Sequence, residues 1–139
     1  MSLVLDCSAT LAGVYGDETT DAVRAVFEAV GSNGAWVPAL WRLEVANVLE
    51  MGVRRRRHDA AFRDATLADL ALLPIRLDPE TDQHAWGATA RLAARHGLTL
   101  YDAAYLELAR RADLPLASLD QGLRTASLAE GVPLLGMDA

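Results

Sequence analysis

The strongest constraint on the fold is a set of short apolar runs that each stop at a polar or acidic residue. The first run, Leu-Val-Leu at residues 3–5, is followed directly by Asp6 and, two residues later, by Ser8. Three consecutive apolar residues suit a strand that is buried on both faces, as in a parallel sheet. Ligands of open α/β sheets bind outside the carboxyl ends of the strands, so a carboxylate at this position is well placed for chemistry.

Strand-like runs alternate with helix-like patterns along the whole chain. Further strands are expected over residues 35–37, 74–77, 114–117 and 132–135. Helices are expected over residues 9–14, 21–30, 39–57, 60–73, 79–96, 99–111 and 123–128. This order predicts an α/β fold with a central, largely parallel sheet of four to five short strands flanked by helices. The last run contains Pro133, which favours an edge strand, and the length predicts a single domain over residues 1–139.

Two of the expected helices carry predictions about packing. The pattern over residues 39–57 is apolar almost all round, which predicts that most of this helix is buried. In the pattern over residues 79–96, Trp86, Ala90 and Leu92–Ala93 are expected to face inward. The apolar stretches 41–49 and 67–73 are expected in the core, with a dimer face as the alternative for either.

Composition excludes several classes of function. All 13 basic residues are Arg, and the absence of Lys excludes phosphate-binding loops and Schiff-base enzymes and argues against a receiver domain. Cys7 is the only cysteine, which excludes disulfide frameworks and paired-cysteine metal sites. No signal peptide or membrane span is evident, so we expect a cytoplasmic protein with no membrane partner. The net charge of −6 does not indicate nucleic-acid binding, and it leaves a carboxylate-bound metal as the expected positive charge of a site.

Four carboxylates are predicted to meet at one edge of the sheet. Asp6 and Asp120 follow strand ends, Asp102 stands at a helix start, and Glu44 lies early on an apolar helix after another strand. Each has a structural explanation alone, as a helix cap or as the partner of an Arg. Together they would repel one another unless cations compensate, and oxygen-only ligands suit Mg²⁺ or Mn²⁺. Such ions activate a water and stabilise a leaving oxygen, which favours a metal-dependent nuclease.

The motifs that contain these acids resemble those of the PIN-domain family, and more narrowly those of VapC toxins of bacterial toxin–antitoxin pairs. The resemblance covers residues 3 to about 135. It rests on Leu-Val-Leu-Asp6-Cys-Ser8, Glu44-Val-Ala-Asn47, Thr99-Leu-Tyr-Asp102-Ala-Ala-Tyr and Ser118-Leu-Asp120. Many relatives have Pro before the Tyr-Asp pair, where Leu100 stands here, and this difference is expected to affect only the shape of the loop.

This resemblance implies a PIN-like fold and a Mg²⁺-dependent endoribonuclease that hydrolyses RNA phosphodiester bonds with metal-activated water. It implies four catalytic and metal-binding acids, Asp6, Glu44, Asp102 and Asp120. It also implies polar residues that bind substrate or orient these acids, namely Ser8, Asn47 and Thr99. Our hypothesis is that Asp6 and Asp102 hold the metal ion directly and that Asn47 holds Glu44. The implied partners are RNA, a cognate antitoxin and a second copy in a homodimer.

Three alternatives remain open at this point. Histidine-based nuclease chemistry would use His58, His84 or His96, although none of them follows a predicted strand. A catalytically silent PIN-like module would use the same groove only to bind a protein. The basic run over residues 54–57 is either a solvated helix end, whose cations favour the helix dipole, or a patch that contacts phosphates.

Overall fold

A computed structural model describes residues 1–137, and the last two residues of the domain expected over 1–139 lie outside this range. In the described part of the chain, five strands form one sheet: β1 (Leu3–Leu5), β2 (Ala35–Val37), β3 (Ile75–Leu77), β4 (Leu116–Ala117) and β5 (Leu134–Leu135). Their order is β3-β2-β1-β4-β5, and every neighbouring pair is parallel. The predicted α/β class is confirmed, and the strand after Pro133 lies at an edge as predicted.

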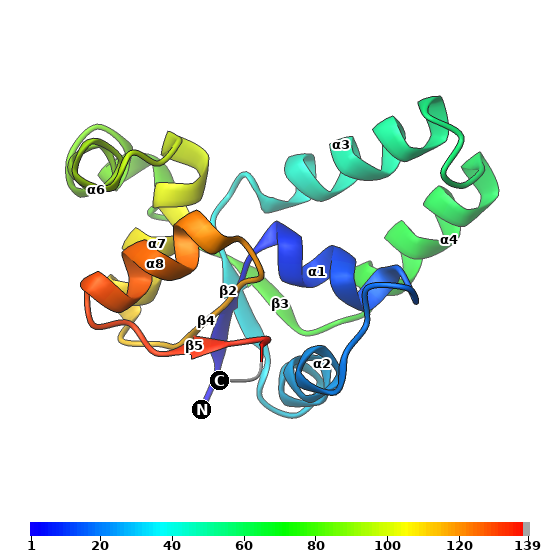
Figure 1. The fold of residues 1–139 in the computed structure, drawn as a ribbon, viewed down its shortest axis with the longest axis horizontal. Helices are drawn as coiled ribbons and strands as arrows, with labels where there is room; N and C mark the ends of the chain where they lie inside the picture. Colours follow the sequence, from blue (N-terminus) through cyan, green and yellow to red (C-terminus); the bar gives the residue numbers. More distant parts are fainter. Residues whose placement is uncertain (138–139) are drawn as a thin grey trace.

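Eight helices connect and flank the strands within residues 1–137. They are α1 (Cys7–Val14), α2 (Asp21–Asn33), α3 (Trp41–Arg54), α4 (Ala60–Ala71), α5 (Thr81–Ala85), α6 (Ala88–His96), α7 (Leu100–Ala112) and α8 (Gln121–Ala129). Right-handed crossovers from β1 to β2 and from β2 to β3 place α1–α4 on one face of the sheet, and the later crossovers place α5–α8 on the other. Figure 1 shows this division, with α1–α4 on the right and α6–α8 on the left.

The direction of the strand connections changes between β1 and β4. The crossover from β1 leads to β2 on one side, whereas the connection from β4 leads to β5 on the other side. Such a switch point leaves a crevice at the carboxyl ends of the two strands, which is the usual ligand site of open α/β sheets. Asp6 directly follows β1, and Ser118 directly follows β4. The topology therefore brings two polar residues from distant parts of the chain to one place.

The core is built around β1 and α7. The three residues of β1 are almost completely buried, which explains why this strand has no polar residue. Residues 103–109 of α7 form seven consecutive buried positions, and α7 packs against β1 and β4. The Thr99 hydroxyl caps the start of α7, and Asp6 caps α1 in the same way. Helix ends and strand ends are thus fixed by the same polar residues that border the crevice.

The prediction that most of the helix over residues 39–57 is buried is wrong. The observed α3 buries Trp41, Val45, Leu49 and Gly52, while the Leu43 side chain is 77% exposed. The helix contacts α1 and α4 along one side only and then projects with α4 as a hairpin, at the upper right of Figure 1. Apolar residues on its other side therefore reach solvent, because nothing in the described chain covers them.

The helix expected over residues 79–96 is two helices, α5 and α6. Gly87 separates them with a backbone conformation outside the helical range. Trp86, expected to face inward, is 96% exposed on the turn between the two helices, and Ala90 is only partly buried. Leu92 and Ala93 are buried as predicted. The break rotates α6 relative to α5. A single periodicity over residues 79–96 therefore gives the wrong orientation for the residues before the break.

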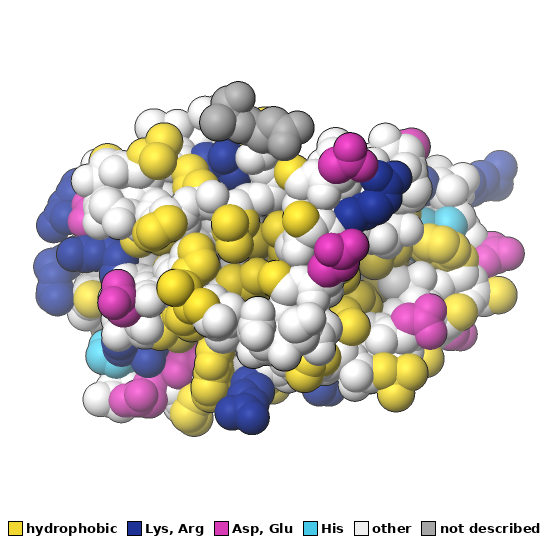
Figure 2. All heavy atoms as spheres, turned by 90° about the horizontal axis from the view of Figure 1, so that it is seen from below, with side chains coloured by type: hydrophobic (Ala, Val, Ile, Leu, Met, Phe, Trp, Pro, Cys, Tyr) yellow, Lys and Arg dark blue, Asp and Glu magenta, His cyan; other side chains and the backbone are white. Residues whose placement is uncertain are grey.

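Apolar and charged side chains are mixed on the surface. In Figure 2, hydrophobic side chains gather across the middle of the face seen from below, and most charged side chains lie around them. Both Arg and acidic side chains lie around these hydrophobic side chains, in a chain that carries 13 Arg and 19 acidic residues. None of the helices in residues 1–137 is both long enough and apolar enough to span a membrane.

Candidate active site

The four predicted acids lie at helix starts near the carboxyl edge of the sheet. Asp6 and Asp120 are the N-cap residues of α1 and α8, and Glu44 and Asp102 lie in the first turns of α3 and α7. The starts of α1, α3 and α8 lie close together in the upper middle of Figure 1. Helix N-termini carry partial positive charge, so they favour carboxylates at these positions. We call the set of Asp6, Glu44, Asp102 and Asp120 the acidic rim.

Asp6 is the most deeply buried member of the acidic rim, with 4% of its surface exposed. Its Oδ1 accepts a hydrogen bond from the Ala9 amide at 2.8 Å, which caps α1. Burial raises the pKa of Asp6 from 3.8 to about 6, with a smaller contribution from the charge of Asp102, although its hydrogen bonds oppose the shift. A carboxylate that is this buried and that has no cation partner among residues 1–137 has a strong physical reason to bind one.

Two serines hold the Asp6 side chain. The Ser8 hydroxyl lies 2.7 Å from Asp6 Oδ1 and also receives a hydrogen bond from the Leu119 amide at 2.9 Å. The Ser118 hydroxyl donates to Asp6 Oδ2. Ser118 is fully buried, and it also accepts from the Asp120 amide at 3.1 Å. These contacts fix the Asp6 carboxylate from both sides and tie the end of β1 to the end of β4.

Glu44 is held by a tyrosine from the core. The Tyr105 hydroxyl donates to Glu44 Oε1 at 2.6 Å, and Tyr105 is 1% exposed. Partial burial raises the pKa of Glu44, and the nearby charge of Asp102 adds to this shift. Burial and the neighbouring Glu44 carboxylate also raise the pKa of Tyr105, which therefore stays protonated as the donor. The expected contact with Asn47 is not formed, because no hydrogen bond within residues 1–137 joins Asn47 to Glu44.

Asp102 is placed by the cap of α7. The Thr99 hydroxyl accepts a hydrogen bond from the Asp102 amide at 3.1 Å, so Thr99 fixes the first turn that carries this acid. Burial and the charge of Asp120 raise the pKa of Asp102. Asp120 itself is exposed, and its Oδ2 accepts from the Leu123 amide at 2.8 Å as the cap of α8. Asp6 and Asp120 therefore cap helices, as the structural explanation predicted, and they also belong to the acidic rim.

The acidic rim is an uncompensated patch of negative charge. Burial is the main cause of the raised pKa values of Asp6 and Glu44, and the charge of Asp102 adds to both, as expected for neighbouring carboxylates. In the described residues, none of the four acids forms a salt bridge. Within the same residues, no three acidic, His or Cys side chains are close enough to form a ready-made metal site. The oxygen ligands and the uncompensated charge fit Mg²⁺ or Mn²⁺.

The histidines contact other parts of the molecule. His58 Nε2 lies 2.9 Å from the Tyr15 hydroxyl, and His96 Nε2 lies 2.7 Å from Glu130 Oε2. Across residues 1–137, no histidine forms a hydrogen bond with the acidic rim. The observed contacts give no support to the alternative of histidine-based chemistry.

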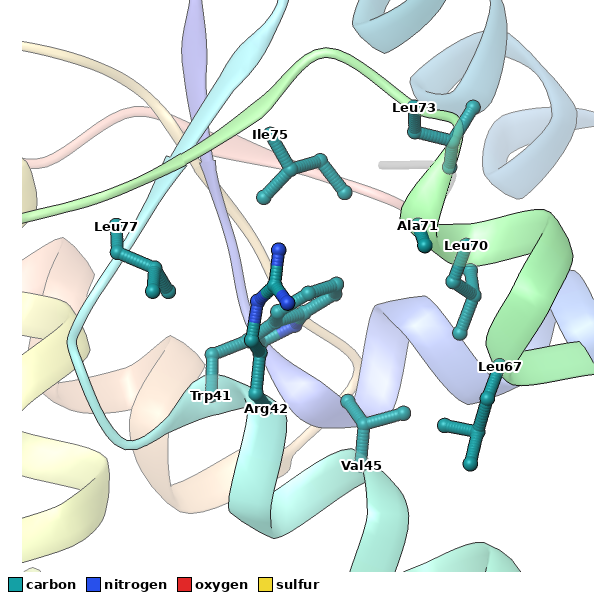
Figure 3. A pocket seen from close by; sticks show the side chains of 9 residues that line it. All are labelled: Trp41, Arg42, Val45, Leu67, Leu70, Ala71, Leu73, Ile75 and Leu77. Atoms are coloured by element: carbon teal, nitrogen blue, oxygen red, sulfur yellow. The ribbon is translucent and has the colours of Figure 1, made fainter.

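A separate apolar hollow lies between α3, α4 and β3. It has a volume of about 190 Å³, and its walls come from Trp41, Val45, Leu67, Leu70, Ala71, Leu73, Ile75 and Leu77, with Arg42 at one side. Figure 3 shows Arg42 extending from α3 into the space below β3. The stretches 41–49 and 67–73 thus contribute partly to the core and partly to this hollow. It contains no carboxylate, so it is not a place for metal-dependent chemistry.

Sequence reasoning did not assign roles to Ser118 and Tyr105, although both residues stand in the motifs that carried the family resemblance. Ser118 contacts Asp6 across 112 residues of sequence, and Tyr105 contacts Glu44 across 61 residues. The available signal for Ser118 was its position at the end of a predicted strand, beside the strand that carries Asp6. Tyr105 gave the weaker signal of a hydroxyl among the apolar residues of α7.

Comparison with known proteins agrees with this fold. The sequence model of a family described as PIN domain matches residues 3–127. PIN domains are generally nucleases, which supports a hydrolase. A comparison with curated protein sequences gives no significant match.

Solved structures give the same picture. The crystal structure of PAE2754 from Pyrobaculum aerophilum is 25% identical with a TM-score of 0.68, over 96% of this chain and 83% of that one. FitAcB from Neisseria gonorrhoeae is 15% identical with a TM-score of 0.66, over 96% of both chains. VapBC2 from Rickettsia felis, solved with a DNA fragment from its promoter, is 11% identical with a TM-score of 0.63, over 96% of this chain and 97% of that one.

Proposed function

This chain belongs to the PIN domain family, and from that membership and its acidic rim we propose that it is a Mg²⁺-dependent endoribonuclease, the toxin of a toxin–antitoxin pair. One observation carries the proposal. None of the four rim acids forms a salt bridge in residues 1–137, although the chain has 13 Arg. Arg side chains are available and pair with acids elsewhere, so the four acids are kept free of internal cations. Carboxylates in this state suit a divalent ion.

Each residue near the rim has a proposed role. When bound, Mg²⁺ supplies positive charge for the attacking water and for the leaving oxygen of the phosphodiester. Asp6 and Asp102 provide its direct ligands, and Glu44 and Asp120 complete the ligand set or orient the water. Ser8 orients Asp6, with which it shares a hydrogen bond.

Three further residues support these acids. Ser118 donates to Asp6, Tyr105 donates to Glu44, and Thr99 fixes the helix turn that carries Asp102. Contacts of this kind orient metal ligands, and their loss typically costs 10- to 100-fold in affinity or activity. Asn47 remains a proposed substrate contact, since its side chain is exposed on α3.

The proposed partners follow from the family. They are an RNA substrate, a cognate antitoxin and a second copy of this chain, in the cytoplasm, with residues 1–139 as a single domain. The motifs resemble those of VapC toxins, and the fold resembles that of the VapBC2 structure. Both similarities support the proposal that an antitoxin is a partner of this chain. Exposed apolar residues such as Leu43 and Leu72, which are 77% and 84% exposed, support a protein partner, either the antitoxin or a second copy of this chain.

The test is RNA cleavage by purified, antitoxin-free protein with Mg²⁺, with EDTA and with the Asp102→Asn variant. Cleavage is expected only for the wild type with Mg²⁺, and Asp102→Asn is expected to lose on the order of 10³-fold in rate, because a direct metal ligand loses its charge. Asp113→Asn, at the other end of α7, is the matched control and is expected to retain full activity.

Two outcomes would contradict the proposal. A folded Asp102→Asn protein with wild-type activity would remove the acid from the mechanism, and cleavage that resists EDTA would exclude the metal. If the wild type cleaves no RNA and calorimetry detects no Mg²⁺ binding, the silent binding module is the better description.

A further inference from the structure

A groove lies between the C-terminal end of α1, which Tyr15 caps, and the second half of α3. Both helices begin at the rim and pack against each other, and the Tyr15 hydroxyl at the end of α1 lies 2.9 Å from His58 in the turn between α3 and α4. The groove has a volume of about 340 Å³ and is lined by Tyr15, Asn47, Val48, Met51, Gly52, Arg55 and Arg57. Glu44, Val48, Met51 and Arg55 follow one another at spacings of four, three and four residues, so one stripe of α3 connects the rim to this groove.

The far end of the groove is rigidly built. The guanidinium carbon of Arg57 lies 3.6 Å from the centre of the Tyr15 ring, and the Tyr15 hydroxyl bonds to His58. Gly52 allows this packing, because a Cβ at that position would lie 2.3 Å from His58 Nε2. Arg57 also pairs with Asp17 at 3.3 Å and with Glu18 at 2.7 Å. Its charge is therefore already balanced by two acids.

Arg55 differs from Arg57 in this respect. It is exposed, it lines the groove, and it forms no salt bridge in residues 1–137. Arg54 in the same run pairs with Glu50, and Arg56 is exposed but lies outside the groove. The free guanidinium of Arg55 and the amide of Asn47 line the same groove, and both provide donors that match phosphate and sugar oxygens. Because the protein has a net charge of −6, an RNA strand needs a local cation of this kind to bind its phosphates.

We infer that the groove between α1 and α3 binds the single-stranded RNA substrate on one side of the cleavage point, with Arg55 contacting a backbone phosphate. This inference rests on the proposed nuclease function. The rise along α3 from Glu44 to Arg55 is about 16 Å, at roughly 1.5 Å per residue. That length corresponds to about five stacked nucleotides at roughly 3.4 Å each. The substrate therefore extends at least that far from the cut on one side, which makes the groove a determinant of substrate length.

The test measures binding of a labelled uridine strand of about 20 nucleotides by fluorescence anisotropy in EDTA, over a range of salt concentrations. Arg55→Gln is expected to bind about fivefold more weakly at about 0.1 M salt, because one phosphate contact fewer lowers the salt slope by about 0.7. Arg56→Gln loses the same charge outside the groove and is expected to stay within about twofold of the wild type. Thermal melting of both variants confirms that the fold is retained.

A second pair of variants tests the groove without removing an Arg. Val48→Glu places a carboxylate on the groove wall, where it repels phosphate, and is expected to weaken RNA binding severalfold. Leu43→Glu makes the same change on an exposed position of α3 outside the groove and is expected to have little effect.

Equal effects of Arg55→Gln and Arg56→Gln would overturn the groove assignment. An Arg55→Gln protein that loses affinity for the antitoxin but not for RNA would also overturn it, by assigning the surface to a protein. In either case, Mg²⁺-dependent cleavage by the wild type would leave the nuclease function standing. A wild type that neither binds nor cleaves RNA would overturn both.

Discussion

Two groups of buried acids in this protein have opposite surroundings. In the acidic rim, Asp6, Glu44 and Asp102 have no cation partner among residues 1–137. At the end of β3, Asp78 accepts hydrogen bonds from Arg111, which also bonds to Glu107 at 2.9 Å. Asp78 and Glu107 are 4% and 5% exposed, so they are as buried as Asp6. Burial alone therefore does not decide whether an acid in this chain receives a partner.

The pKa values move in opposite directions in the two groups. Burial would raise the pKa of Asp78, but the hydrogen bonds from Arg111 and the Glu80 amide lower it overall. Burial raises the pKa of Asp6, Glu44 and Asp102, and the hydrogen bonds at the rim only partly oppose this shift. An Arg partner compensates the charge of a buried acid, whereas a buried acid without a partner reduces the stability of the fold, and such acids cluster at functional sites. We therefore propose that Asp78 and Glu107 serve the structure, and that the acidic rim serves the function.

The largest expected effect concerns Arg111. Arg111→Gln leaves Asp78 and Glu107 buried without their cation and is expected to lower the free energy of unfolding by about 3 kcal/mol, measured by urea denaturation. Arg110→Gln, which removes a more exposed pair with Glu130, is expected to cost less than about 1 kcal/mol. The rim variant Asp102→Asn is expected to cost nothing or to stabilise the metal-free protein, because it relieves repulsion. Equal losses for Arg111→Gln and Asp102→Asn would contradict the division into two groups.

The next effect is the pH dependence of Mg²⁺ binding. A proton on Asp6 competes with the metal ion until the pH exceeds its pKa of about 6 in the metal-free protein. The affinity for Mg²⁺, measured by calorimetry, is therefore expected to rise about tenfold per pH unit below pH 6 and to level off above it. An affinity that is constant between pH 5 and pH 7, to within about twofold, would show that Asp6 does not bind the ion.

The raised pKa of Asp6 also makes the stability of the metal-free protein depend on pH. Between pH 3.8 and about 6 the folded protein keeps a proton on Asp6 that the unfolded chain has released. The contribution of Asp6 to the stability of the metal-free protein therefore declines as the pH rises through this window. The lowered pKa of Asp78 has the opposite consequence, since its contribution is present above the unfolded pKa and is lost in more acidic solution.

The smallest effect concerns Tyr105, which we assign as a positioning residue. Tyr105→Phe removes the donor to Glu44 and is expected to lower kcat by about tenfold, with an unchanged KM for RNA. The loss of stability is expected to be about 1 kcal/mol, the usual net value of one hydrogen bond. Tyr101→Phe is the control in the same helix, because Tyr101 is 62% exposed. If both variants retain full kcat, Glu44 does not depend on its contact with Tyr105.

The parts of the fold that depend on local sequence could be predicted. The run Leu3–Leu5 gave the central strand, because only a strand buried on both faces suits three successive apolar residues. The caps at Asp6, Thr99 and Asp120 are local as well, since a capping side chain contacts the backbone three residues later. The positions of these acids at strand ends and helix starts followed from the same patterns.

Features that depend on contacts between distant segments could not be predicted. The register of β1 with β4 pairs Leu5 with Ala117, and this register brings Ser118 to Asp6. Hydrophobic periodicity does not specify register between strands so far apart in sequence. It also does not reveal which apolar residues lack a neighbour, which is why Trp86 and most of the helix over residues 39–57, which contains Leu43, were expected inside the protein.

The pairing of β1 with β4 has a consequence during synthesis of the protein. While the ribosome has made only the first hundred or so residues, β1 can pair with β2, but Asp6 lacks Ser118 and α7 is incomplete. Pairing of such distant segments is slow, because a long loop must close first. Under the proposed nuclease function, a nascent chain is therefore without a finished active site until nearly all of it has emerged, which gives a partner that binds early-forming helices time to act before any RNA is cut.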